Sequence, residues 1–326
     1  MSLSLVFETI KKEERKKSNS GLVKLTTCGN ILETMEMERV NRKGTSIYNL
    51  GDGQYCHLSE IDLSTGEVHG EIKEFQRTEN RAENYYGMRK SMKMVRDLIN
   101  CNVTIPENVR WMTFTYAENM TDTVRLYEDR KAFWKRVQRW HKKKGFPVPE
   151  YITIVEPQGR GAWHLHELWI YPYKAPFLPN SEIASLWGFG FVTVKKLDDV
   201  DNIGAYITAY LCDVPLEEID RENIVSSMPI KEVEVTQEDG TKVTKKMVKG
   251  ARLHLYPNKM NFYRTSRGIK RPRVEWIPEE KAKEKVSAGT LTYSKTLRLT
   301  DTSGAEEYTN DIHYEYYNLV RGKKQE

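Results

Sequence analysis

Two histidines one residue apart, with a glutamate shortly upstream, are the residues whose types and spacing point most directly to chemistry. They lie in YITIVEPQGRGAWHLHELWIY (151–171), where two apolar runs flank a turn rich in glycine and proline. Side chains alternate along a strand, so His164 and His166 are expected to share one face of the second run. If the two runs pair as a hairpin, the carboxylate of Glu156 can reach the same point. The pattern therefore predicts a His-His-Glu site for a divalent metal ion.

Two tyrosines about 40 residues downstream are the second candidate for chemistry. Apolar residues recur every four positions over 200–212, which predicts a helix. Tyr206 and Tyr210 are also four apart and would share one face of that helix. A phenol has an ordinary pKa of about 10, so it is a poor nucleophile at neutral pH unless a neighbouring group activates it.

The elements that must position these residues alternate between strand and helix patterns. Alternating apolar and polar positions, or short apolar runs, predict strands at 110–119, 151–155, 163–171 and 191–195. Helical spacing predicts helices at 81–100 and 123–143, and a short helix near 181–187. We expect Thr121 or Asp122 to cap the second of these helices, and Asn180 or Ser181 to cap the short one.

The chain divides into three regions by pattern. Residues 1–80 form an N-terminal accessory region of short β-prone pieces, to which the sequence assigns no role; its stretch KKEERKKSNSG (11–21) is expected to be exposed and mobile. Residues 81–277 carry the candidate chemistry and end in a charged hairpin (228–250) and an LHLY strand. Residues 278–326 form a C-terminal extension with a terminal strand pair, TLTYSKTLRL and IHYEYYNLV.

Composition limits the class of protein. The chain has 326 residues, 39% hydrophobic and 30% charged, as expected for a globular protein with a polar surface. No apolar run approaches 18 residues, and the N-terminus has its apolar part before its charges, unlike a secretory signal; we expect a cytoplasmic protein without a membrane partner. The four cysteines are widely spaced and form no CxxC pair, so they are interpreted as incidental or structural thiols.

Basic residues cluster in two stretches although the net charge is only +5. Residues 81–144 carry about twice as many basic as acidic residues, and residues 259–273 carry six Lys/Arg and no acid. The second stretch also contains aromatic residues, a mixture that single-stranded nucleic acid favours. We predict DNA contacts for a set of exposed cations, comprising Arg264, Arg267, Lys270, Arg271, Arg160, Lys195 and Lys196.

Three motifs occur in order along the chain: the strand TFTY (113–116), the strand HLH (164–166) with Glu156 upstream, and the helix AYITAYLCD (205–213). Together they resemble the HUH endonuclease superfamily, specifically the rolling-circle replication initiator (Rep) proteins of bacterial plasmids and phages. The resemblance covers roughly residues 85–275. It implies an α+β fold in which a central antiparallel sheet of the ferredoxin/RRM-like HUH type carries the metal site and helices flank it.

The resemblance also implies an activity and its partners. His164, His166 and Glu156 would bind one Mg²⁺ or Mn²⁺, and Tyr206 and Tyr210 would nick origin DNA by transesterification, leaving a 5′-phosphotyrosine and a 3′-OH primer. The second tyrosine would re-join the strand at termination. The partners implied are single-stranded or hairpin origin DNA, a host helicase, since no GxxxxGK[ST] motif is present, and a DNA polymerase. The protein would act as a monomer or a homodimer.

One departure from the family pattern concerns tyrosine activation. Many relatives carry a lysine beside the nucleophile, whereas Ala209 precedes Tyr210 and the predicted helix has no lysine. Lys195 and Lys196 lie just upstream and are the candidates to replace it.

Other interpretations of the same residues stay open. The histidines could be ordinary strand residues, and the tyrosines could pack in the core or stack on DNA. The chain could be a non-catalytic protein that binds origin or single-stranded DNA, or an HUH nickase of transposase or relaxase type. A metal-dependent hydrolase or cupin-like protein is a further alternative, although the histidines lack the downstream partners typical of those sites.

Overall fold

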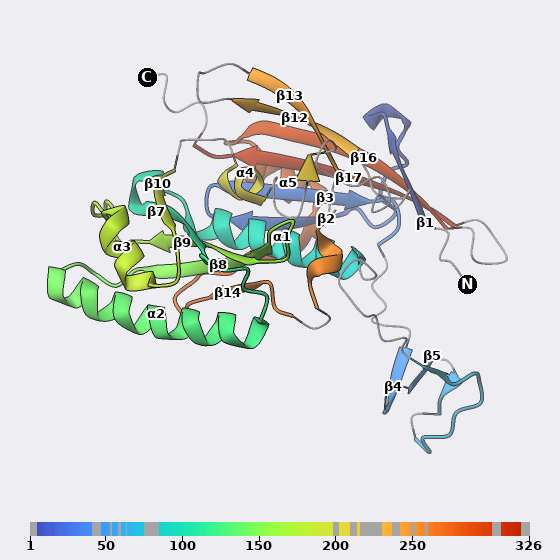
Figure 1. Ribbon diagram of the computed structural model, residues 1–326. Helices are drawn as coiled ribbons and strands as arrows, with labels where there is room; N and C mark the ends of the chain where they lie inside the picture. Colours follow the sequence, from blue (N-terminus) through green and yellow to red (C-terminus); the bar gives the residue numbers. More distant parts are fainter. Residues whose placement is uncertain are drawn as a thin grey trace.

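Two antiparallel sheets, connected by helices, form the body of the protein (Figure 1). The structure, a computed structural model, describes residues 5–40, 47–52, 54–57, 60–62, 64–74, 85–197, 202–208, 214–215, 230–236, 242–248, 252–257, 260–301 and 308–320. The prediction of an α+β fold with a central antiparallel sheet and flanking helices is confirmed.

The first sheet carries the histidines and has five strands in the order β10-β7-β9-β8-β14. Its members are β7 (Val109–Thr115), β8 (Glu150–Pro157), β9 (Trp163–Ile170), β10 (Val192–Lys196) and β14 (Tyr263–Thr265). All four pairings are antiparallel. The strands expected from alternation therefore form, and the hairpin of β8 and β9 lies next to the sheet's middle, where neighbours fix it on both sides.

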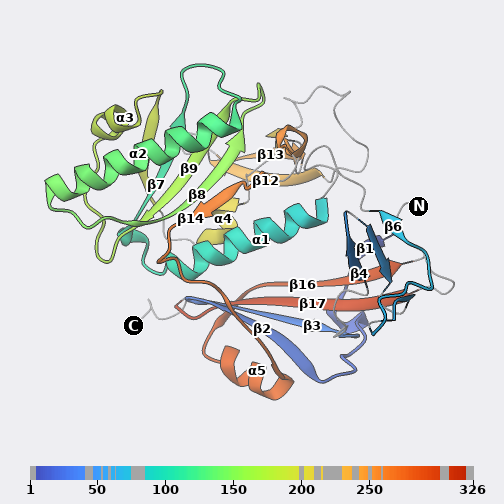
Figure 2. The ribbon, with the colours of Figure 1, turned by 90° about the horizontal axis from the view of Figure 1, so that it is seen from below.

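Helices cover both faces of this sheet (Figures 1 and 2). The helices α2 (Thr123–Lys144) and α3 (Asn180–Trp187) lie on one side, and α1 (Tyr85–Asn102) and α4 (Ile203–Thr208) lie on the other. Phe114 of β7 packs against Phe133 of α2 and Trp187 of α3, with ring centroids 4.9 and 5.4 Å away. Alternation along β7 directs the next residues, Trp111, Thr113 and Thr115, to the α1 side.

Capping explains where two of these helices begin. The carboxylate of Asp122 accepts hydrogen bonds from the backbone N–H groups of Val124 and Arg125, so one of the two caps expected for α2 is present. The expectation for α3 is wrong, because Pro179 occupies its N-cap position without a side-chain hydrogen bond. The amide oxygen of Asn180 instead accepts from the backbone N–H of Val194, which ties the start of α3 to β10.

The second sheet is built from both ends of the chain. Its order is β1-β16-β17-β3-β2-β15. Its strands are β1 (Leu5–Ile10), β2 (Leu22–Cys28), β3 (Ile31–Met37), β15 (Arg273–Pro278), β16 (Thr290–Asp301) and β17 (Tyr308–Asn318). The predicted terminal strand pair is β16 and β17, and the N-terminal piece LVKLTT lies in β2. The three-region division of the chain stays a prediction, but the outer two regions share this sheet.

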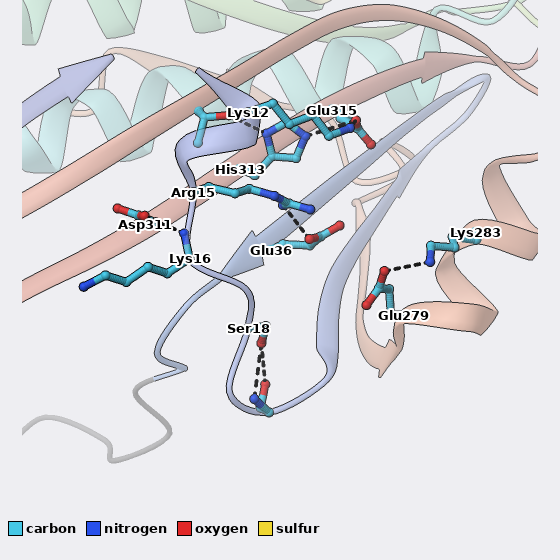
Figure 3. A network of polar contacts seen from close by, with 12 residues as sticks. Lys12, Arg15, Lys16, Ser18, Glu36, Glu279, Lys283, Asp311, His313 and Glu315 are labelled. Atoms are coloured by element: carbon cyan, nitrogen blue, oxygen red, sulfur yellow. Dashed lines mark hydrogen bonds and ion pairs between the residues drawn. The ribbon is translucent and has the colours of Figure 1, made fainter. Parts of the chain in front are cut away.

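The basic stretch that follows β1 is ordered by ion pairs, so its interpretation as an exposed and mobile segment is wrong. A 3₁₀ turn, η1 (Lys12–Glu14), crosses the sheet face that also carries α5 (Glu279–Val286). Lys12 Nζ lies 2.6 Å from Glu315 Oε1, and Arg15 Nη1 lies 2.5 Å from Glu36 Oε2 (Figure 3). The partners come from β17 and β3, which local sequence patterns could not indicate.

Two smaller sheets complete the described fold. One comprises β4 (Ile47–Gly51), β5 (Gln54–His57) and β6 (Lys73–Glu74), and the other β11 (Val214–Pro215), β12 (Ile230–Thr236) and β13 (Lys242–Val248). The charged hairpin expected at 228–250 is β12 and β13, and its expected Asp239-Gly240 turn lies outside the described residues. The remaining elements are the 3₁₀ turns η4 (Pro106–Asn108) and η7 (Leu253–Leu255). Among the described residues, no helix has the length and apolar character needed to cross a membrane.

Candidate active site

Strand register brings the histidines and the glutamate onto one face. Glu156 of β8 is paired with His164 of β9, and Thr115 and Thr113 of β7 are paired with His164 and His166. Directly paired residues in an antiparallel sheet point to the same side. The five side chains therefore form a patch on the α1 side of the sheet, opposite the face that packs on α2.

The ring of His166 is held from three directions. Its Nε2 lies 3.1 Å from Glu156 Oε2, and its Nδ1 lies 3.1 Å from Thr113 Oγ1. The ring also stacks on the indole of Trp111, with centroids 5.3 Å apart. A metal-binding imidazole needs its second nitrogen bonded in this way, because that bond sets the tautomer and the ring orientation. Thr113 meets that requirement if Nε2 faces the metal.

His164 carries a nitrogen without a partner. Its Nε2 is buried and makes no hydrogen bond within the described part of the chain. Burial lowers the pKa of His164 to about 4, and His166 adds to the shift against the attraction of Glu156. The ring is therefore neutral at physiological pH. A buried polar atom without a hydrogen bond is uncommon, and a neutral imidazole with an open Nε2 is the form that ligates metals.

Arg252 is a site residue that the sequence did not reveal. Its Nη1 lies 2.9 Å from Glu156 Oε1, and its Nε is buried without a hydrogen bond in the described residues. Arg252 immediately precedes η7, where the sequence predicted an LHLY strand; the structure forms a 3₁₀ turn there instead. Tyr256 anchors that turn, because its hydroxyl donates to the carbonyl of Val155 at 2.7 Å. No local pattern distinguishes Arg252 from the other cations of its segment.

The donor set fits a divalent cation in type, but its side chains have not converged. Two imidazoles and a carboxylate suit Mn²⁺ or Zn²⁺, and with bound waters also Mg²⁺. Within the described residues, no group of three His, Cys, Asp or Glu side chains has the geometry of a metal site. The reason is visible at Glu156, whose two oxygens are directed to Arg252 and His166.

The tyrosine helix is described only in part. Its observed span, α4, is shorter than the predicted 200–212, and the side chain of Tyr206 and all of Tyr210 lie outside the described residues. The backbone of α4 packs tightly on α1. The N–H of Gly204 donates to Asn100 Oδ1 at 2.8 Å, and a Cβ at Gly204 would overlap the carbonyl oxygen of Arg96. Ile203 and Ile207 are buried in the same core as the sheet.

The two lysines of β10 lie on opposite faces. Lys195 is paired with Trp111, which stacks on His166, so Lys195 belongs to the site face. Lys196 is paired with Arg110 and faces the α2 side. Both side chains are exposed. Of the two lysines considered as replacements for a helix lysine, the structure brings Lys195 to the correct side of the sheet.

The predicted DNA-contacting arginines are spread over several surfaces. Arg160 lies exposed in the β8–β9 turn, where its Nε donates to Gln158 Oε1 at 3.1 Å. Arg264 is paired with Thr153 and stacks 3.8 Å above the ring of Tyr127 of α2, so it lies on the face opposite the histidines. Three others, Arg267, Lys270 and Arg271, are exposed in the segment that links β14 to β15.

Comparison with known proteins links the site segment to replication. Residues 109–214, about a third of the chain, match the family model of replication-associated proteins of the ORF2 type. The match runs from β7 into β11 and so includes the TFTY strand, the HLH hairpin and α4. This match supports the resemblance to replication initiators at the level of a replication-associated family. No curated protein and no solved structure matches the chain.

Proposed function

We propose that this protein initiates rolling-circle DNA replication by nicking one strand of origin DNA through a tyrosine. The observation that carries the proposal is the patch of Glu156, His164 and His166 on one sheet face, within a segment that matches a replication-associated family. The open Nε2 of His164 supports a ligand at that patch. A role in replication follows from the family match, and the nicking chemistry is our extension of it.

The chain's own residues define how the reaction would run. His164, His166 and Glu156 would hold a Mg²⁺ or Mn²⁺ ion, which when bound offsets negative charge on the scissile phosphate. The phenolic oxygen of Tyr206 or Tyr210 attacks phosphorus, and the bond from phosphorus to the 3′-oxygen breaks. That oxygen takes up a proton and becomes the free 3′-OH, while the 5′-phosphate stays on the tyrosine. The other tyrosine can reverse the step at termination without hydrolysis.

Two cations near the patch would assist the same step. Arg252 lies against Glu156, and Lys195 lies on the same face as His166. A guanidinium can contact phosphate oxygens in a fork, and a lysine can donate a proton or stabilise charge. A host helicase and a DNA polymerase would act on the nicked product, and the protein would work as a monomer or a homodimer.

The experiment that tests the proposal follows a covalent adduct. Purified wild type, Tyr206→Phe, Tyr210→Phe and the double variant are incubated with a labelled single-stranded origin oligonucleotide and Mn²⁺ on a denaturing gel. We expect an adduct in the wild type, none in the double variant, and restoration by Mn²⁺ or Mg²⁺ after EDTA treatment. His164→Ala should abolish the adduct, whereas His69→Ala, an exposed histidine elsewhere, should leave it unchanged. An adduct that persists in the double variant would refute the tyrosine assignment.

A non-catalytic DNA-binding protein is the second candidate. The observation that favours it is the ion pair between Arg252 and Glu156, which occupies a carboxylate that a metal would need. This alternative expects unchanged oligonucleotide affinity after EDTA treatment and no adduct under any metal. The gel experiment separates the two functions, because only the nickase forms a protein–DNA band.

A further inference from the structure

An exposed tryptophan and valine mark the edge strand of the six-stranded sheet. Val274 and Trp276 of β15 are 49% and 43% exposed, although both are large apolar side chains. The alternate residues of the strand are engaged on the other side: Ile277 packs in a cluster with Val286 of α5, and Glu275 lies 3.6 Å from Lys285 Nζ. The outward face of β15 therefore presents an indole and a branched side chain that no described element covers.

Positive charge surrounds this apolar pair. Lys24 of β2 is the direct register partner of Trp276 and shares its face. The chain from Arg264 to Trp276 carries five Lys/Arg and one acid. Among the described residues, Arg267, Lys270 and Arg271 are exposed and form no ion pair. An apolar patch rimmed by unpaired cations is complementary to a polyanion that also has flat apolar groups.

The basic segment is fixed in place. Its backbone at Lys270 exchanges two hydrogen bonds, each 2.8 Å long, with the side-chain amide of Asn102 at the end of α1. The N–H of Gly268 donates to Glu150 Oε2 at 3.1 Å, and a Cβ there would overlap that carboxylate. Residues 266–272 thus form a rigid bridge from β14, beside the candidate site hairpin, to β15. A fixed array of cations loses less entropy on binding than a mobile one.

We propose that β15 and the preceding segment bind single-stranded DNA, with bases stacking on Trp276 and phosphates contacting Lys24, Lys270 and Arg271. Unpaired bases expose the faces that an indole can stack on, whereas duplex DNA hides them; aromatic stacking with basic residues is the usual combination for single strands. The inference rests on the proposed function in one respect: a nickase that primes rolling-circle synthesis works on a displaced single strand. It assigns that strand a surface outside the nicking site.

Binding is measured in a form of the protein that cannot nick. Every variant carries Tyr206→Phe and Tyr210→Phe and is titrated in EDTA against a labelled oligothymidylate, by fluorescence anisotropy. Trp276→Ala should weaken binding by about 5- to 100-fold, since stacking of one base is worth about 1–3 kcal/mol by alanine substitution. Trp276→Phe should retain most of the affinity. Phe177→Ala removes an aromatic side chain that is 82% exposed in another loop, and it should change nothing.

Further measurements keep the proposal falsifiable if Trp276→Ala folds poorly. Lys24→Gln should weaken binding severalfold, and the double variant Lys270→Ala/Arg271→Ala should reduce the slope of log affinity against log salt by about 1 to 2. Unchanged affinity in Lys24→Gln and in folded Trp276→Ala would overturn the proposal. A duplex of equal length that binds more tightly, with the same losses, would assign the surface to duplex DNA instead. Binding through Trp276 without any adduct by the wild type would leave this surface standing and reject the nickase.

Discussion

The Nη1 atom of Arg252 lies 2.9 Å from Oε1 of Glu156, although the two residues are 96 positions apart. The pair is largely enclosed, with 23% of the Arg252 side chain and 10% of the Glu156 side chain exposed. A carboxylate that already carries a guanidinium is a weaker ligand for a cation, because the two positive charges repel each other and compete for one oxygen. Arg252 is therefore placed to control when Glu156 becomes available.

Removal of this guanidinium should strengthen metal binding. Arg252→Gln keeps a hydrogen-bond donor near Glu156 but removes the charge, and we expect the affinity for Mn²⁺ to rise roughly tenfold in isothermal titration calorimetry. Arg160→Gln removes an exposed arginine of the hairpin turn and serves as the matched control, with a change of no more than about twofold. A lower Mn²⁺ affinity in folded Arg252→Gln would show that Arg252 supports the site rather than competing with it.

Beneath the histidine strand, a buried ion pair should hold the hairpin against α2. Arg130 Nε lies 2.8 Å from Glu167 Oε1, and the same carboxylate accepts from Thr153 Oγ1 and, through Oε2, from Trp169 Nε1. Glu167→Gln leaves the Arg130 charge buried and unpaired, so we expect the free energy of unfolding to fall by about 3 kcal/mol. Urea denaturation measures this loss.

The matched control for that loss is an exposed pair of the same chemistry. Glu118 lies 2.6 Å from Arg125, but 58% of its side chain is exposed. Glu118→Gln should change the urea midpoint little, because solvent already screens that pair. Equal losses in both variants would mean that burial does not determine the worth of the Arg130–Glu167 pair.

Local periodicity accounts for how far the sequence could predict this structure. The histidines share a face because alternation along one strand is a local property, and the helices α1 and α2 follow from spacing within each segment. Residues that depend on distant partners were missed. Arg252 acquires its role only when η7 docks on the hairpin, and the run KKEERKK was expected to be mobile because its partner Glu315 lies 303 positions from Lys12.

Two short elements also escaped prediction, for a related reason. The residues LHLY alternate like a strand, but buried Leu253 and Tyr256 pack against the site hairpin as a 3₁₀ turn, so tertiary packing overrides the local pattern. Asn180 resembles a helix cap, yet its side chain bonds a neighbouring strand instead. The metal and tyrosine roles stay predictions, since they depend on ligands and side chains beyond the described structure.

The outer sheet should show a defined dependence on pH. The pKa of Glu315 lies well below its ordinary value, because His313 hydrogen-bonds its carboxylate and Lys12 and Tyr317 donate further bonds (Figure 3). A lowered folded-state pKa means that the carboxylate stabilises the fold above the unfolded pKa, about 4.3 for glutamate, and that this stabilisation is lost as pH falls towards the folded-state pKa.

Glu315→Gln tests this dependence. We expect the difference in unfolding free energy between wild type and variant to be constant around neutral pH and to shrink as the pH falls below about 4.3. Thermal unfolding followed by circular dichroism at several pH values measures it. Glu13→Gln changes an exposed glutamate of η1 and should give a small difference at every pH. A Glu315→Gln difference that grows on acidification would contradict the sign of the effect.

The closest approach between α4 and α1 gives a test of the tyrosine helix that leaves the metal patch untouched. Gly204 has no room for a side chain, because a Cβ would overlap the Arg96 carbonyl oxygen and the Asn100 amide. Gly204→Ala must therefore push α4 away from α1, and with it the backbone that carries Tyr206. We expect covalent adduct formation to fall at least tenfold, a loss typical of misplaced catalytic groups, while Mn²⁺ affinity stays within about twofold. Gly159→Ala is the control, because that glycine has open space around it and lies in the hairpin turn. If Gly204→Ala forms the adduct at the wild-type rate, α4 does not position the nucleophile; if it loses Mn²⁺ binding as well, the substitution has disturbed the sheet and not the helix alone.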